Sequence, residues 1–249
     1  MMQLGQIAKF ATTALIVPIA ALGIGLGVWS TSASAEGLLP VNAPVPTIDE
    51  PVSGSTETAV FAGGCFWGVQ GVFQHVKGVT SAIAGYSGGT VANPSYEDVG
   101  TEQTGHAESV KVTFDPSQVS YGKLLQIFFS VVTDPTTLNL QGSDAGTSYR
   151  SALFVMNDAQ AKVASAYIAQ LDAAKVYPAK VVTEVTPYKN FYQAEDYHQD
   201  NAYTMKVNPG YLAYFDEPKI ADFKAKYADF WMDKPVLVFA SNADPIVSD

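Results

Sequence analysis

Cysteine is almost absent from this chain: among 249 residues there is one, Cys65. A single cysteine excludes a disulfide within the chain, and it excludes a cysteine-based zinc site or an iron–sulfur cluster built by the chain alone. Any chemistry that Cys65 performs therefore proceeds without a second cysteine of the same chain.

Positive charge is also scarce, since 14 Lys and Arg face 24 Asp and Glu and leave a formal net charge of −10. Nucleic acids and anionic membrane surfaces bind clustered positive charge, so neither is an expected partner. Two stretches rich in Asn and Asp, residues 139–144 and 196–200, lack the alternating oxygen ligands and terminal Glu of a calcium loop. We expect no bound metal and no bound cofactor.

Residues 1–35 have the composition of an export signal. Lys9 is their one charged side chain, an apolar run follows from Phe10 to Val28, and small residues lead to Ala33-Ser34-Ala35. This pattern predicts a cleaved secretory signal and a protein in the periplasm or outside the cell. An uncleaved membrane tether is the alternative. Residues 36–56 hold four prolines among small and polar residues, which predicts an extended, solvated linker.

The rest of the chain has the composition of a globular domain, with 47% hydrophobic and 15% charged residues overall. Apolar periodicities follow the order β-α-β-β-α-β, with an extra α-β unit after it. This order predicts the α+β class and a two-layer split βαβ, the ferredoxin-like plait. The expected strands are 58–62, 79–86, 107–114, 151–156 and 180–186, and the expected helices are 66–77, 121–128 and 158–174. Long segments that we expect to carry function are 87–106, 133–150 and 187–217.

Cys65 lies between the first predicted strand and the first predicted helix, flanked by glycines on both sides of the Cys-Phe-Trp sequence. Backbone N–H groups and the helix dipole at a helix N-terminus favour a thiolate, so we expect a lowered thiol pKa. Phe66 and Trp67 place two large rings beside the sulfur. A buried structural cysteine among core aromatics is the alternative, but the flanking glycines leave the sulfur open to approach and favour a nucleophile.

Glu108 is expected on the face of its strand that looks at the core. Strand alternation puts it on the same face as Val110, Val112 and Phe114. Burial disfavours the charged form of a carboxyl and raises its pKa, which suits a general acid. The alternative is a carboxylate at the end of the strand that reaches solvent.

Tyrosine and histidine give weaker signals. Tyr96 and Tyr149 lie in the long segments and offer hydroxyl groups on rigid arms, but the chain has 13 tyrosines. His75 is expected on the outer side of the first helix, whereas His106 and His198 lie in polar segments. Position alone therefore assigns none of these side chains a role.

Seven short motifs follow one another along the chain. They are Gly64–Gly68, Gly85–Gly89, Asn93–Glu97, Thr104–Glu108, Asp134–Thr137, Asn139–Ser151 and Phe191–Gln199. In order and spacing they resemble the A-type peptide methionine sulfoxide reductases, over residues 57 to about 215. The resemblance implies an enzyme that reduces the S epimer of methionine sulfoxide, free or in oxidised proteins, since separate enzymes act on the two epimers.

The resemblance also implies roles for single residues. Cys65 matches the family's nucleophile, which attacks the sulfoxide sulfur and becomes a sulfenic acid. Glu108 matches the group that protonates the sulfoxide oxygen. The remaining matches are the hydroxyl donors Tyr96 and Tyr149, the aromatic walls Phe66 and Trp67, Asp144 near the substrate amine, and His198 at the pocket edge.

The chain departs from the family pattern in several places. Gly100 stands where members often have a cysteine, and Gln70 stands where they often have an acidic residue. Residues 205–249 lack the recycling cysteines that many members carry, so we expect an external reductant, which is a thioredoxin-like protein, a glutaredoxin-like protein or a small thiol. Asn201 stands where members commonly have a tyrosine, and we expect Tyr203 to take that place.

Two alternatives to the reductase stay open at this stage. One is a cysteine hydrolase, which needs a histidine oriented on the thiol. The other is an exported protein that binds sulfoxide peptides without turnover. The expected catalytic domain is residues 57–217, in a monomer, and residues 218–249 form a tail that is either a docked amphipathic helix or a segment that binds a partner.

Overall fold

The structure, a computed structural model, describes residues 40–239. The predicted export signal, residues 1–35, lies outside this range. Within it, no helix combines the length and the apolar character that crossing a bilayer requires.

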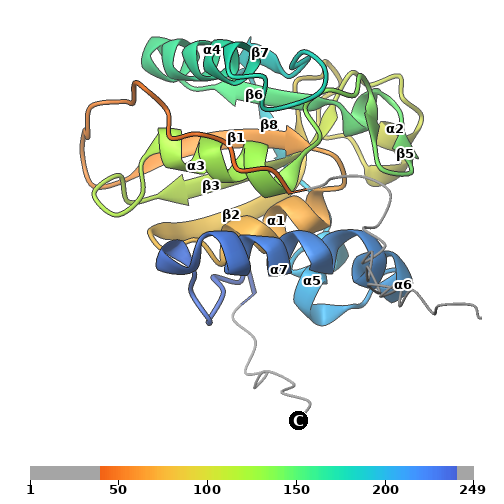
Figure 1. Cartoon of the computed structure of the whole chain (residues 1–249). Coiled ribbons are helices and arrows are strands. Elements are labelled where there is room, and N and C mark those ends of the chain that lie inside the picture. Colours follow the sequence, from red (N-terminus) through yellow and green to blue (C-terminus); the bar gives the residue numbers. More distant parts are fainter. Residues whose placement is uncertain (1–39, 240–249) are drawn as a thin grey trace, which may run out of the picture. The chain divides into compact units, whose positions relative to one another are not determined.

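One mixed sheet organises the described residues (Figure 1). Its strand order is β7-β6-β1-β3-β2-β8, antiparallel throughout except for the parallel pair β6 and β7. A short hairpin of β4 and β5 lies outside it. The strands are β1 (Glu57–Gly63), β2 (Val79–Ser87), β3 (Ala107–Phe114), β4 (Leu140–Gln141), β5 (Asp144–Ala145), β6 (Ser151–Val155), β7 (Glu184–Pro187) and β8 (Phe191–Gln193).

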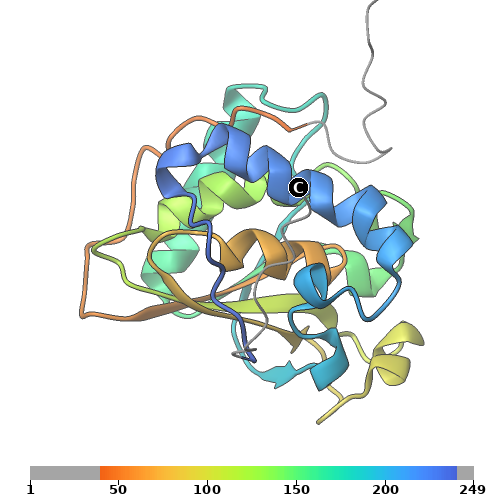
Figure 2. The same ribbon diagram turned by 90° about the horizontal axis from the view of Figure 1, so that it is seen from below.

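The helices that carry the core cover one face of this sheet (Figure 2). Alternation along β1 sends Phe61 into the main core, while Val60 and Ala62 join a small cluster on the opposite face. The helices are α1 (Phe66–Gln74), α2 (Tyr96–Gly100), α3 (Tyr121–Ile127), α4 (Asp158–Ala173), α5 (Asn201–Thr204), α6 (Pro209–Tyr211) and α7 (Glu217–Lys226). Sheet and helices together form an α+β fold, as the sequence predicted.

Local signals set the helix starts. The Ser120 hydroxyl accepts a hydrogen bond from Lys123 N at the start of α3, and the Asn157 side chain accepts one from Gln160 N at the start of α4. Ser95 and Asp98 form a capping box on α2.

The last predicted strand begins later than expected, at Glu184 instead of residue 180. The N–H of Val181 donates to the Asp172 carboxylate at 2.9 Å, and the N–H of Val182 donates to the Pro135 carbonyl at 2.7 Å. These backbone donors are therefore not available to a sheet ladder. In addition, β8 extends the sheet from within the segment 187–217, where the sequence predicted no strand.

The described part of the predicted linker, residues 40–56, forms no helix or strand and is mostly exposed, but it is fixed to the domain at several points. Ala43 is buried, the Tyr167 hydroxyl donates to the Pro44 carbonyl at 2.7 Å, and Gly122 N donates to the Asp49 carboxylate at 2.8 Å. Proline removes a backbone donor but leaves the carbonyl acceptor, so this segment can dock on α3 and α4 through its carbonyls.

The C-terminal segment also belongs to the folded unit, beyond the expected domain boundary at 217. Phe223 on α7 is fully buried, which agrees with the docked helix. His75 lies under this segment, 5% exposed and stacked on Trp231 with ring centres 3.8 Å apart. The expectation that His75 faces outward is wrong, because the chain returns over that side of α1.

Candidate active site

The turn between β1 and α1 places Cys65 at the N-cap position of α1. The preceding Gly64 has a φ of +94°, a backbone conformation that favours glycine. A Cβ on Gly64 would lie 2.8 Å from Cβ of Gln141, so glycine also allows the segment 133–150 to pack on the turn. Cys65 itself is 7% exposed.

The electrostatic surroundings of Cys65 overturn one expectation from the sequence. Burial raises the pKa of the Cys65 thiol well above its usual value, and the carboxyl groups of Asp216 and Glu108 raise it further. The Trp67 backbone N–H and Lys219 favour the thiolate but do not compensate. The resting thiol is therefore protonated, although it lies at a helix N-terminus.

Glu108 lies in the core, 3% exposed, which excludes the alternative of a carboxylate that reaches solvent. One carboxyl oxygen accepts a hydrogen bond from Phe66 N at 2.9 Å, so the carboxyl sits directly at the first turn of α1. Burial raises the pKa of Glu108 to about 8 against the opposing effect of that hydrogen bond. Near neutral pH the carboxyl group holds a proton.

Tyr96 and Tyr149 meet at this site from two different long segments. Tyr96 begins α2, and Tyr149 ends a single 3₁₀ turn, Thr147–Tyr149. Burial, Glu108 and Cys65 together raise the pKa of Tyr96 to about 12, while the Tyr149 side chain opposes the shift. Burial and Glu108 also raise the pKa of Tyr149. Both phenols are neutral hydrogen-bond donors.

Glu195 is a residue that the sequence analysis missed. Its carboxylate accepts a hydrogen bond from Tyr96 N at 2.9 Å and another from the Tyr86 hydroxyl at 2.8 Å. It thereby fixes the start of α2 on β2. Its place inside the motif Phe191–Gln199, three residues before the predicted site residue His198, was the available signal, but no periodicity there indicated which side chain points inward.

The two expected aromatic walls lie around His198. The centre of the His198 ring is 5.1 Å from that of Phe66, 5.7 Å from that of Trp67 and 4.4 Å from that of Tyr96. Trp67 Nε1 donates to His198 Nδ1 at 3.1 Å, and burial lowers the pKa of His198. His198 is thus a neutral member of the aromatic wall, directed at Trp67 and not at the thiol as a hydrolase would need.

Tyr211, and not Tyr203, supplies the further aromatic side chain. Its ring lies edge-on to Trp67 with centres 5.8 Å apart, and its hydroxyl donates a hydrogen bond to the Asp144 carboxylate. Tyr203 lies instead against His75 and donates to the Gly71 carbonyl. The expectation for Tyr203 is wrong because α5 runs along the other side of α1, a contact that sequence spacing does not reveal.

Asp216 is a second carboxyl that the sequence analysis missed. It is fully buried, and a Cβ on Gly68 would lie 2.2 Å from its Oδ1, so glycine on α1 makes room for it. Lys219 Nζ lies 3.6 Å from the same oxygen. Burial raises the pKa of Asp216 to about 6 against the effect of Lys219, so it is mostly ionised at neutral pH.

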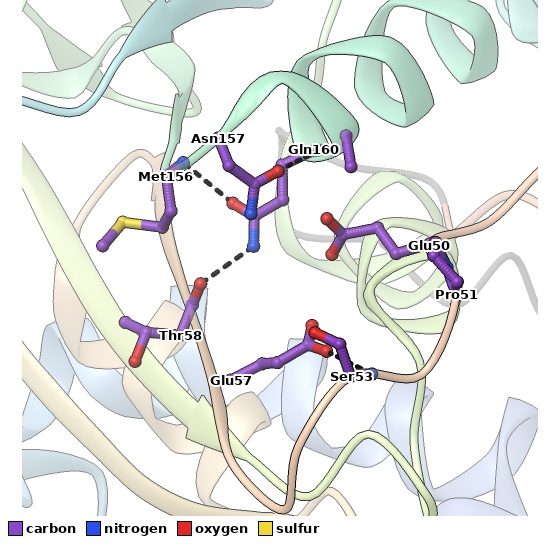
Figure 3. A pocket seen from close by; sticks show the side chains of 9 residues that line it. Glu50, Pro51, Ser53, Glu57, Thr58, Met156, Asn157 and Gln160 are labelled. Carbon is purple, nitrogen blue, oxygen red and sulfur yellow. Dashed lines mark hydrogen bonds between the residues drawn. The ribbon is translucent and has the colours of Figure 1, made fainter.

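A separate pocket of about 230 Å³ lies between the N-terminal segment and the start of α4 (Figure 3). Glu50 and Glu57 face each other across it, and none of the expected site residues lines it. Burial and the neighbouring Glu57 raise the pKa of Glu50 to about 7. Nowhere in residues 40–239 do three His, Cys, Asp or Glu side chains group as metal ligands.

The site brings together a buried thiol, a protonated carboxyl and two phenols at the N-terminus of one helix. This arrangement defines a thiol-dependent enzyme on an α+β fold. A family model described as peptide methionine sulfoxide reductase matches residues 57–230. The chain belongs to the peptide methionine sulfoxide reductase family, of the A type, and it is a methionine sulfoxide reductase.

Individual relatives agree with this assignment. The chain is 54% identical over 197 residues to peptide methionine sulfoxide reductase MsrA 2 of Mesorhizobium japonicum, covering 78% of this chain and 100% of the relative. It is 48% identical over 190 residues to MsrA 2 of Synechocystis sp., covering 75% and 88%.

Solved structures show the same fold. Mxr1 of Saccharomyces cerevisiae in reduced form is 30% identical with a TM-score of 0.56, covering 66% of this chain and 91% of Mxr1. Methionine sulfoxide reductase A of Corynebacterium diphtheriae is 31% identical with a TM-score of 0.53, covering 70% and 89%. The predicted family and enzyme class are confirmed, and the alternative of a binding protein without turnover is not supported.

Proposed function

We propose that this chain reduces the S epimer of methionine sulfoxide, free or in oxidised proteins, by attack of Cys65 on the sulfoxide sulfur. The observation that carries this proposal is the protonated carboxyl of Glu108 beside Cys65. A sulfoxide oxygen is an acceptor, and Glu108 with the hydroxyl groups of Tyr96 and Tyr149 offers it donors from one side.

The step balances in atoms and electrons. Sγ of Cys65 first forms a bond to the methionine sulfur while the sulfoxide oxygen takes up a proton. The hydroxyl group then passes to Sγ as the bonds from the methionine sulfur to Sγ and to oxygen break, so the thiol becomes S–OH while the sulfoxide becomes a thioether. Glu108 gives its proton to the oxygen and regains one as the thiol ionises. The methionine sulfur is reduced by two electrons, and Cys65 is oxidised by two.

The walls of the site suit the rest of the substrate. Trp67 and Phe66 lie side by side as the wall that contacts the S-methyl group of the substrate. Aromatic rings suit this role because sulfur and methyl groups pack well on them. We assign Asp144 to the substrate backbone amine, and the hydrogen bond that it accepts from the Tyr211 hydroxyl at the edge of the aromatic wall supports this role. His198 stiffens this wall through its bond with Trp67.

An external thiol completes the cycle, because the chain has no other cysteine. One thiol attacks the sulfenic acid, releasing water and leaving a mixed disulfide, and a second thiol releases Cys65 as a thiol. A thioredoxin-like protein, a glutaredoxin-like protein or a small thiol can supply both.

Three further inferences accompany this proposal. The inner strand order β6-β1-β3-β2, with α1 and α3 as its crossovers, supports the split βαβ plait. The composition of residues 1–35 supports a signal peptide and export to the periplasm or beyond. We further infer a monomer.

The test is a single-turnover reaction without reductant. The purified chain is mixed with each epimer of a blocked methionine sulfoxide, and the methionine released and the mass of the Cys65 peptide are measured. We expect about one equivalent of product from the S epimer alone, with one oxygen gained on Cys65. No product from either epimer, with Cys65 unchanged, would refute the proposal.

A further inference from the structure

Glu102 has a left-handed backbone conformation, and its carboxylate accepts three hydrogen bonds. It lies between α2 and β3 with a φ of +63°, the left-handed region that side chains other than Gly, Asn and Asp seldom adopt. A glutamate retained in this conformation needs compensating contacts from the surrounding structure.

Those contacts all go to the 3₁₀ turn that carries Tyr149. One carboxylate oxygen accepts from the Thr147 hydroxyl at 2.7 Å and from Ser148 N at 2.9 Å, and the other accepts from the Ser148 hydroxyl at 2.6 Å. Burial works against the charge, but the hydrogen bonds from Ser148 and Thr147 lower the pKa of Glu102 below its usual value. The Glu102 carboxylate is therefore ionised, and hydrogen bonds to an ionised group are stronger than those between neutral groups.

The turn is packed closely onto this carboxylate. Gly146, which precedes the turn, has a φ of +150°, and a Cβ there would lie 2.4 Å from a Glu102 oxygen. On its other side the turn is held by Arg150, which donates to the Thr147 carbonyl at 2.8 Å and to the Gly105 carbonyl at 3.0 Å. Tyr149 is thus the residue between two anchored neighbours.

We propose that Glu102 is a positioning residue that holds the Tyr149 hydroxyl at the place of the sulfoxide oxygen. The proposal rests on the function proposed above, since it requires Tyr149 to donate to that oxygen. A fixed turn that holds the phenol at the right distance and angle removes the free-energy cost of reorienting it during the reaction. Glu102 does not touch the substrate itself.

The main test is a double-mutant cycle of Glu102→Gln with Tyr149→Phe, measured as kcat and KM with the S epimer of a blocked methionine sulfoxide. Glu102→Gln keeps the side-chain length but loses the charge that orders the turn. We expect about a tenfold or larger fall in kcat with a smaller change in KM, since displacements of this kind cost up to about 100-fold. In the Tyr149→Phe background, Glu102→Gln should cost nothing further.

Two more variants separate positioning from folding. Glu102→Gly removes the steric strain of a side chain at positive φ, so it should keep or raise the melting temperature. It should nevertheless lower kcat as Glu102→Gln does. Gln103→Ala removes the exposed neighbouring side chain and should leave kcat within about twofold.

Several results would overturn the proposal. Glu102→Gly with full kcat would show that the carboxylate is not needed. An equal loss in the Tyr149→Phe background would show that Glu102 acts independently of Tyr149. An unchanged kcat in Tyr149→Phe alone would remove the role of Tyr149, whereas an unsubstituted chain that reduces neither epimer would contradict the proposed function itself.

Discussion

Glu108 beneath the cysteine and Glu50 in the pocket of Figure 3 are two carboxyl groups with raised pKa values, to about 8 and about 7. Burial is the largest cause in both. Neighbouring acids add to the shift of both pKa values, among them Asp144 for Glu108 and Glu57 for Glu50. The difference is that Glu108 also lies beside a thiol, two phenols and the N–H of Phe66. A raised pKa therefore indicates burial, and only a nucleophile within reach makes it a candidate for catalysis.

The largest difference between Glu108 and Glu50 is expected when each carboxyl is replaced by an amide. Glu108→Gln should lower kcat by about 10²- to 10⁴-fold, the usual contribution of a general acid. The matched variant Glu50→Gln should leave kcat unchanged. Steady-state kinetics with the S epimer measure both, and comparable losses in the two variants would mean that Glu108 acts only through the fold.

The pH dependence of the single-turnover rate distinguishes the two groups next. Because the protonated form of Glu108 is the donor, the rate should fall as pH rises through about 8. This falling limb should persist in Glu50→Gln and disappear in Glu108→Gln. Stopped-flow measurements between about pH 6 and 9 follow it. A limb that survives Glu108→Gln would assign it to another group.

The Asp216 carboxylate affects the ionisation of the Cys65 thiol itself. It is one of the causes that raise the pKa of Cys65, second after burial. Asp216→Asn should therefore increase the thiolate fraction at neutral pH and make alkylation of Cys65 by iodoacetamide several-fold faster. The exposed Asp229→Asn on the same segment is the control. Equal alkylation rates in all three proteins would show that the charge of Asp216 does not reach the sulfur.

The smallest expected effect concerns stability. The pKa of Glu50 is raised in the folded chain, so between its ordinary value and about 7 the folded state binds more protons than the unfolded state. Stability should therefore decrease as pH rises through this window, and Glu50→Gln should make the decrease shallower. Urea unfolding at about pH 5 and pH 7.5 measures it. An identical pH dependence in both proteins would contradict the shift.

The sequence predicted those features that depend on near neighbours in the chain. Cys65 follows a strand and precedes a helix, and Glu108 shares the inward face of β3, because strand and helix periods are local properties. The strand Ala107–Phe114 was predicted with its observed bounds. The motif order also indicated the family before any geometry was available.

Tertiary structure alone decided the rest. It brought Tyr211 and Asp216 from the C-terminal segment onto α1, docked the segment around Ala43, and joined Tyr96 and Tyr149 across two loops. Tertiary structure also decides the ionisation state of Cys65. A helix N-terminus adjacent in sequence favours the thiolate, but burial and carboxyl charges from distant segments outweigh it, because both depend on what packs around the sulfur and not on the order of residues beside it.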